Sequence, residues 1–292
     1  MHHPYTQFRY RIFSLPFSFV WAKINSAWFY LREAMTPLQA QVLHEGAIYA
    51  GLVDDKYATR CRRTFWLLFI TERAYALQRS HPLSLKPTIS LPTVDPGPEA
   101  TILRGFIDLV YRFHNFDDTF ISLWNLRSAG SVIPPHRFIH LQDILSSALP
   151  DVSQRSEIQQ ADLLVTIQWL KTVVCELCVA RSFLFSATAY ECMSFEYPIV
   201  ISRNIAIISH LLPPTACEAH GIGILEKIFD IGCSLVDVLL LHTDSIPISG
   251  REVGPRDYLV ELVRILGTVM RGSSKYLSLL TVKAKECLTR SN

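Results

Sequence analysis

Charged residues are scarce in this sequence, and the charges that are present nearly cancel. Of its 292 residues 18% are charged, and 28 Lys and Arg residues against 26 Asp and Glu residues leave a formal net charge of +2 at pH 7. A compact domain that binds nucleic acid usually carries a clear basic excess, so we expect no direct nucleic-acid binding by this chain. Because 49% of the residues are hydrophobic, we expect a large buried core and an ordered chain.

Long hydrophobic runs and regularly spaced cysteines are lacking too. No stretch of the sequence approaches the about 18 consecutive apolar residues of a membrane-spanning helix, so no membrane segment is expected. The seven cysteines are odd in number and irregularly spaced. A chain of this length does not need disulfides to hold a core, so we interpret them as reduced thiols of a nuclear or cytosolic protein.

Metal, cofactor and nucleophile sites also find little support. Three groupings could carry such chemistry: Asp117-Asp118, Cys175 with Cys178, and Cys217 with His220. The aspartate pair lacks the third acid and the second motif of a terpene-synthase magnesium site, and the Cys-x-x-Cys pair lacks a second pair at zinc-finger spacing. Cys217 and His220 have only Glu218 nearby as an orienting acid. We expect an acidic turn and buried thiols here, with no metal, no cofactor and no catalytic residue.

Helical periodicity is what the sequence does contain. Apolar residues recur at three- and four-residue steps from Ala27 to Val42, and the run from Thr64 to Leu77 is apolar on most sides, as in a buried helix. Strand signals are few and interrupted by proline. The sequence therefore predicts an all-α fold, a multi-helix bundle of eight or more helices in a single large domain or two tightly packed lobes.

Prolines indicate the boundaries of the helical region. Residues 1–23 are expected to form an irregular N-terminal segment, because Pro16 interrupts their apolar stretch. Residues 24–292 are expected to form the helical domain. Within it, five prolines in the stretch 81–98 are incompatible with a helix and predict an extended connector over the surface.

Local signals also predict where individual helices begin and end. Pro37 should kink or end the first helix. A capping box pairs an N-cap Ser or Thr with Glu or Gln three residues later. Ser156 with Gln159, and Thr215 with Glu218, fit this pattern and predict helices that open at these positions.

Positive charge is concentrated where one of the predicted helices begins. Three arginines precede the apolar run: Arg60, Arg62 and Arg63. Positive charge at a helix start opposes the helix dipole, so Asp54, Asp55 or an external anion would have to compensate it. Farther along, Glu72 and Arg73 fall in buried surroundings, where we expect them to join an ion-pair network with other helices. A structural network is favoured over a ligand site.

Residues of this same helix carry a resemblance to a known family. They are Arg62, Arg63, Phe65, Trp66, Glu72, Arg73, Arg79 and Pro82. In this order and spacing they resemble the signature of the fungal-specific transcription factor domain, the middle homology region of the zinc binuclear cluster regulators. Three later stretches, Gln159–Lys171, Tyr197–Asn204 and His220–Ile231, are similar to the sugar-utilisation branch of these regulators.

The resemblance implies a regulatory domain that acts in the nucleus, or alternatively in the cytoplasm. Its partners would be a small-molecule effector, a second copy of the chain or other transcription proteins. No cysteine precedes position 61, so this sequence lacks the six-cysteine cluster with which the family reads DNA. It would therefore be a fragment of a larger activator or a truncated paralogue. The alternative is a stand-alone helical protein that uses the scaffold as a small-molecule or enzymatic pocket, because a fold does not fix a function.

Overall fold

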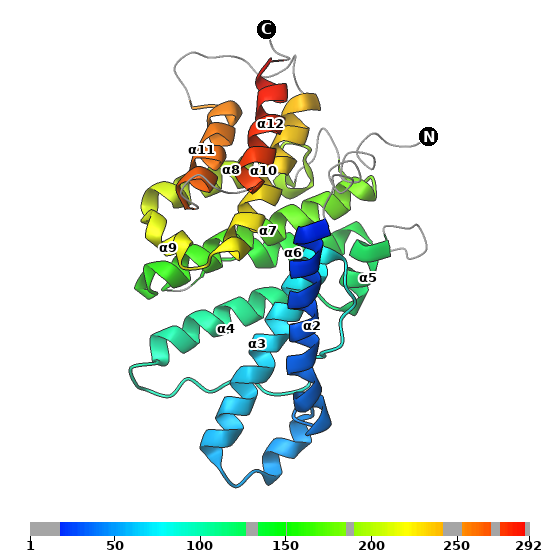
Figure 1. Cartoon of the computed structure of the whole chain (residues 1–292), viewed down its shortest axis with the longest axis vertical. Helices are drawn as coiled ribbons and strands as arrows, with labels where there is room; N and C mark the ends of the chain where they lie inside the picture. Colours follow the sequence, from blue (N-terminus) through cyan, green and yellow to red (C-terminus); the bar gives the residue numbers. More distant parts are fainter. Residues whose placement is uncertain are drawn as a thin grey trace. The chain divides into compact units, whose positions relative to one another are not determined.

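The structure, a computed structural model (Figure 1), describes residues 18–126, 134–149, 151–184, 190–241, 253–269 and 275–289. Within these ranges the chain is helical and contains no strand. The helices labelled α2 to α12 exceed the eight expected, so the all-α prediction is confirmed. The chain divides into two compact units, Met1–Val132 and Ile133–Asn292.

The first unit is organised around α3. Its elements are α2 (Ser18–Ala40), the 3-10 helix η1 (Gly46–Gly51), α3 (Asp55–Arg79), α4 (Ala100–His114) and α5 (Asp118–Leu126). The helices α2, α4 and α5 each pack against α3, and α2 and α3 run side by side in Figure 1. Because α3 has neighbours on several sides, its aromatic residues Phe65 and Phe69 are completely buried.

The second unit is organised around α7 and α10. Its elements are α6 (Pro135–Ser146), η2 (Val152–Gln154), α7 (Glu157–Ala180), η3 (Glu191–Met193), α8 (Tyr197–Leu211), α9 (Pro214–Glu218), α10 (Ile222–Leu241), α11 (Pro255–Val269) and α12 (Lys275–Thr289). The helix α10 packs against α7, α8, α11 and α12. Gly232 of α10 faces Leu280 of α12 so closely that an added Cβ would lie 2.7 Å from a Leu280 methyl carbon.

Among the described residues, α7 alone is long and apolar enough to cross a bilayer by length and composition. No membrane-spanning stretch is predicted from the sequence. Of this helix's most apolar window, 78% is buried inside the protein. The buried face includes the polar residues Thr166, Gln168 and Thr172. A core helix of a folded domain has these properties, and α7 is the core helix of the second unit.

The first helix extends beyond its expected limits at both ends. Residues 1–17 lie outside the described part of the chain, but α2 already begins at Ser18, inside the segment expected to be irregular. Pro37 lies within α2, which continues to Ala40. The helix then ends in a Schellman motif, in which Val42 is left-handed (φ 58°) and the Leu43 N–H donates to the Leu38 carbonyl at 3.0 Å.

Of the two predicted capping boxes, one provides the expected N-cap hydrogen bond, although not the return bond from the Gln159 side-chain oxygen. The Ser156 hydroxyl accepts from the Gln159 N–H at 3.3 Å and caps α7, as predicted. Thr215 instead lies inside α9, whose first residue is Pro214. The chain breaks after α9 at Gly221, which adopts φ 56°, so α10 begins only at Ile222. The second capping box was therefore wrong: a proline at the first helical position fixed the start of a shorter helix.

Candidate functional site

The aromatic residues of the signature form the core around α3. Phe65 and Trp66 are 0% and 2% exposed. Their rings meet edge to face at 5.3 Å, and Trp66 meets Phe69 in the same manner at 4.8 Å. The Trp66 indole N–H donates to the Ser90 carbonyl at 3.1 Å. Trp66 therefore ties the helix to the connector that follows it, because a buried indole N–H needs an acceptor.

The three arginines expected at a helix start lie inside α3, which begins earlier, at Asp55, so they do not oppose the helix dipole as predicted. Their partners also differ from the prediction. The carboxylate of Asp54 caps the helix by accepting from the N–H groups of Lys56 at 2.9 Å and Tyr57 at 3.1 Å. Arg63 pairs instead with Glu99 at 2.8 Å, and the Arg62 guanidinium lies 4.7 Å from the ring centre of Tyr49. These contacts provide protein partners for two of the three arginines.

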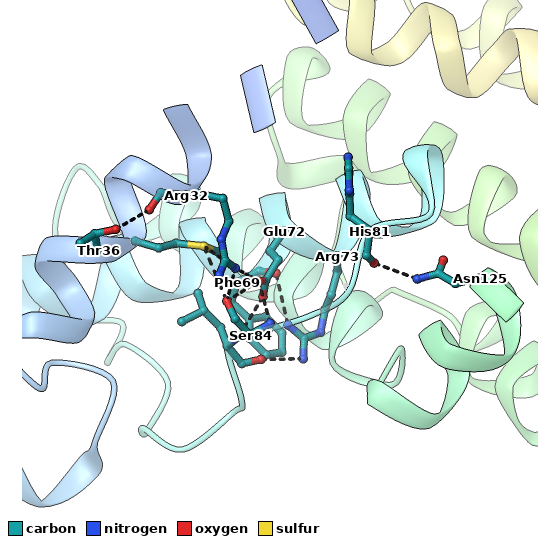
Figure 2. Close-up of polar contacts among 10 residues, drawn as sticks. Arg32, Thr36, Phe69, Glu72, Arg73, His81, Ser84 and Asn125 are labelled. Atoms are coloured by element: carbon teal, nitrogen blue, oxygen red, sulfur yellow. Dashed lines mark hydrogen bonds and ion pairs between the residues drawn. The ribbon is translucent and has the colours of Figure 1, made fainter. Parts of the chain in front are cut away.

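Glu72 is the centre of the signature's polar cluster (Figure 2). Its side chain is completely buried. Its Oε1 accepts from the Ser84 N–H at 2.8 Å and the Ser84 hydroxyl at 2.6 Å, and its Oε2 accepts from the Leu85 N–H at 3.0 Å. Arg32 of α2 contributes an ion pair at 3.4 Å. A buried carboxylate is costly unless it is paired and hydrogen-bonded, and these donors meet that requirement.

Arg73 binds the same stretch of chain from the other side. Its guanidinium donates to the carbonyls of Leu85 at 3.2 Å and Phe69 at 3.4 Å, and its carbon lies 3.3 Å from the centre of the Phe69 ring. Burial lowers the pKa of Arg73 to about 10, and the negative charges of Glu72, Asp118 and Asp117 oppose this shift. The predicted network thus includes one partner helix, α2, but most of its bonds go to the connector.

We name residues 80–92 the strap, because they run back along α3 without forming a helix. At its beginning, Ser80 is left-handed (φ 56°) and ends α3, and Arg79 donates to the Gln78 carbonyl at 3.2 Å. Next, the His81 ring stacks on Trp28 with 4.1 Å between centres, and exposed Pro82 follows. The signature residues Arg79 and Pro82 therefore mark the start of the strap.

The acidic pair of the sequence analysis lies at a helix start. The Asp117 carboxylate accepts from the Phe120 N–H at 2.9 Å, as an N-cap residue does. Asp118 is the first residue of α5. Across the described ranges, no group of three or more His, Cys, Asp and Glu residues could hold a metal ion.

The cysteine pairs are buried rather than poised for reaction. Cys175 and Cys178 are 1% and 0% exposed, and burial raises the pKa of both thiols, that of Cys178 to about 12. Burial likewise raises the pKa of Cys217. A ring nitrogen of His220 lies 2.7 Å from the Ile158 carbonyl. Reactive cysteines need a lowered pKa, so this geometry does not support nucleophilic chemistry at these thiols.

The stretches that resemble the sugar-utilisation branch lie on helices of the second unit, where they contain a polar seam that the sequence analysis missed. Lys227 of α10 reaches Asp162 at 3.2 Å and Thr166 at 2.6 Å, both on α7. One turn farther along, the Trp169 indole N–H donates to Asp230 at 3.0 Å. The sequence does show polar residues at helical spacing inside apolar helices, which could have indicated a seam. It does not show which of them pair, because the partners lie more than sixty positions apart.

Curated fungal proteins match this chain at low identity. The probable sucrose utilization protein SUC1 of Candida albicans is 26% identical over 231 residues, which cover 76% of this chain and 44% of that protein. The maltose fermentation regulatory protein MAL13 of Saccharomyces cerevisiae is 23% identical over 209 residues, covering 71% of this chain and 43% of that protein. The maltose fermentation regulatory protein MAL63 of the same species is 24% identical over 180 residues. The chain thus spans less than half the length of these relatives.

No protein-family model matches the chain, and no solved structure matches it at a significant level. Its relationships therefore rest on the signature on α3, the three later stretches and the curated relatives. These agree with one another, because the relatives cover most of the chain and carry names from sugar utilisation. The resemblance to the sugar-utilisation branch is confirmed: at low identity the chain is similar to a fungal sucrose utilization protein and to two maltose fermentation regulatory proteins.

Proposed function

We propose that this chain is the regulatory part of a fungal sugar-utilisation regulator, which acts in the nucleus by binding an effector or a partner protein. The observation that carries the proposal is the match of 71% of the chain to a maltose fermentation regulatory protein. The signature on α3 supports it, since four of its residues, Phe65, Trp66, Glu72 and Arg73, are buried on this helix. DNA contacts would then come from elsewhere, in keeping with a net charge of +2.

A reporter assay tests the regulatory role. The full chain is fused to a heterologous DNA-binding domain in a yeast that lacks its own maltose regulators, and the reporter is measured on maltose, sucrose and glucose. We expect output to depend on the sugar. The control is the same fusion with Trp66→Ala, which should weaken the response because it destabilises the core around α3. Equal output on all three sugars from a stably expressed fusion would contradict the proposal.

Effector binding is tested separately on the purified chain. A ligand that binds only the folded state at 100 times its Kd raises the free energy of unfolding by about 2.7 kcal/mol. We therefore expect maltose or sucrose to raise the Tm, while a non-metabolised disaccharide at equal concentration does not. If no sugar raises the Tm but the fusion still responds, the response comes through a partner protein.

The expected absence of DNA binding has its own measurement. Binding to random duplex DNA is titrated at several salt concentrations, because phosphate contacts give affinities that fall steeply with salt. We expect no measurable binding at physiological salt. Salt-sensitive binding by the isolated chain would show that it contacts DNA without the zinc cluster.

A further inference from the structure

The strap is held to α3 at discrete points rather than by continuous secondary structure. Leu85 and Ile89 are buried, at 2% and 6% exposure, whereas their neighbours Lys86, Pro87 and Ser90 are exposed. The strap's own backbone contributes the bond from the Thr88 N–H to the Lys86 carbonyl at 2.8 Å. Such a segment can open locally, because few buried apolar contacts oppose its detachment.

Polar anchors are spaced along the strap. Near its start, Glu72 and Arg73 bind both faces of the Ser84–Leu85 backbone. In its middle, the Thr88 hydroxyl donates to the His44 carbonyl, and close to its end the Ser90 carbonyl accepts from Trp66. The first anchor is the strongest in chemical terms, since hydrogen bonds to charged groups are about twice as strong as neutral ones.

Among the charged members of the first anchor, Arg32 is the one that solvent reaches. Glu72 is completely buried and Arg73 is 2% exposed, but the Arg32 side chain is 43% exposed. Arg32 contacts both α3 and the strap, because its Nη1 lies 3.4 Å from Glu72 Oε1 and donates to the Ser84 hydroxyl at 2.6 Å. Withdrawing Arg32 leaves the buried carboxylate with less positive charge beside it. That loss favours hydration of Glu72, which requires the strap to lift.

We propose that the strap is a releasable element, latched at the junction of Arg32, Glu72 and Ser84, and that Arg32 is the point at which its release is controlled. The strap joins the end of α3 to the segment that leads into α4. Opening therefore changes the connection between two helices that pack on each other, while the helices themselves stay folded. The regulatory role of the strap rests on the proposed function, whereas its local opening does not depend on that function.

Hydrogen exchange of the full chain tests the latch. Arg32→Met removes the charge but keeps much of the side-chain length. The matched control is Arg63→Met, because Arg63 is similarly exposed (40%) and pairs with a carboxylate at 2.8 Å, but that partner, Glu99, is 69% exposed. We expect Arg32→Met to speed exchange of the Ser84 and Leu85 amides by about tenfold or more, with α3 and α7 amides unchanged. Arg63→Met should leave the strap at the wild-type rate.

Two outcomes overturn the proposal. One is wild-type exchange of the Ser84 and Leu85 amides in Arg32→Met. The other is faster exchange of the strap only in parallel with α3, which means that the unit opens as a whole. If Arg32→Met does not fold, Ser84→Ala gives the same test, because it removes one donor to Glu72 and keeps the charges. A strap that opens locally in a chain whose reporter ignores sugars supports the latch and contradicts the proposed regulator.

Discussion

The two long core helices, α3 and α7, solve the problem of buried polarity in different ways. They are similar in length, 25 and 24 residues, and both are buried on most sides. The helix α3 buries the carboxylate of Glu72 and the guanidinium of Arg73, and both bind the backbone of the non-helical strap. In α7 the most deeply buried polar residues, Thr166 and Thr172, are neutral, and the charged Lys171 is 8% exposed. Gln168 of α7 accepts from Asn204 of α8 at 3.3 Å.

The difference reflects what each helix must hold. Helices that pack on α7 have satisfied their own backbone groups, so apolar packing with a few hydrogen bonds and the partly buried pair of Asp162 and Lys227 is enough. The strap has free N–H and C=O groups that need partners wherever they are buried. Glu72 accepts from two consecutive N–H groups, and Arg73 donates to the carbonyl of the second residue. Buried charge on α3 is thus the means of fixing irregular backbone.

Removing a core tryptophan should have the largest effect on stability and should distinguish the role of α3 from that of α7. Trp66→Ala and Trp169→Ala are each expected to lower the free energy of unfolding by about 3–5 kcal/mol, because both side chains are almost completely buried. Only Trp66→Ala should also speed amide exchange in the strap, since only Trp66 donates to it. Urea unfolding gives the free energies and hydrogen exchange gives the location. Equal loosening of the strap in both variants would remove the distinction between α3 and α7.

Truncating the charged and neutral polar residues should sharpen the comparison. We expect Arg73→Ala to cost about 3 kcal/mol, because it removes the donor to the buried Leu85 carbonyl and leaves Arg32, which is 43% exposed, as the positive charge beside Glu72. The counterpart in the second unit is Gln142, which is 1% exposed and donates to the Lys171 carbonyl at 3.0 Å. Gln142→Ala should cost about 1–2 kcal/mol. Urea denaturation measures both, and an equal loss would show that buried charge has no special weight in α3.

Sequence predicts most of what lies within α3 and little of what it binds. A charged pair in an apolar helical run must be buried and paired, so Glu72 and Arg73 could be identified as a structural network. Their partners could not be identified, since no side-chain pattern marks the amides of Ser84 and Leu85 as donors. The counter-charges of the arginines were likewise misassigned, because Asp54 serves its own helix start. Local signals, in short, compete with tertiary pairing.

In the second unit the same limit applies to helix boundaries and to the polar seam. Ser156 capped its helix as predicted because both members of the box lie within one turn. The break at Gly221 was missed, although a glycine with positive φ is a common end signal of a helix. The pair of Asp162 and Lys227 joins residues 65 positions apart, and periodicity gives the facing side of each helix but not its partner.

Acid should weaken the seam between α7 and α10, because the seam depends on the charge of Asp162. Burial alone would raise the pKa of Asp162, but Lys227 and His220, with hydrogen bonds from Lys227 and Thr166, lower it overall from 3.8. Its stabilising contribution is therefore complete well above pH 3.8 and is lost as the pH falls below that value and through the pKa of the folded state. We expect Asp162→Asn to cost roughly 1 kcal/mol at pH 7 and less in acid.

The matched variant for this prediction is Glu261→Gln, because Glu261 also has a lowered pKa, owing first to its hydrogen bond from Arg264. That pair lies within one helix, three residues apart, so its loss should not weaken contact between α7 and α10. Free energies of unfolding at pH 7 and pH 3 are compared for both variants. A cost of Asp162→Asn that is independent of pH would contradict the assignment of Asp162 as a charged partner of Lys227.

The smallest expected effect lies at the ends of two helices, one in each unit. Unlike the other variants, these should raise the free energy of unfolding. Both α2 and α7 end in a Schellman motif with a left-handed residue, Val42 (φ 58°) in one and Ser182 (φ 57°) in the other. A left-handed conformation costs an L-residue about 1–2 kcal/mol and is least tolerated by a β-branched side chain. Glycine relieves this strain but gains freedom in the unfolded chain.

We therefore expect Val42→Gly to raise the free energy of unfolding by about 0.5–1 kcal/mol and Ser182→Gly by less. Because Val42 is 36% exposed, little packing is lost, and a decrease in its Tm would mean that the valine side chain stabilises the end of α2 more than its backbone strains it.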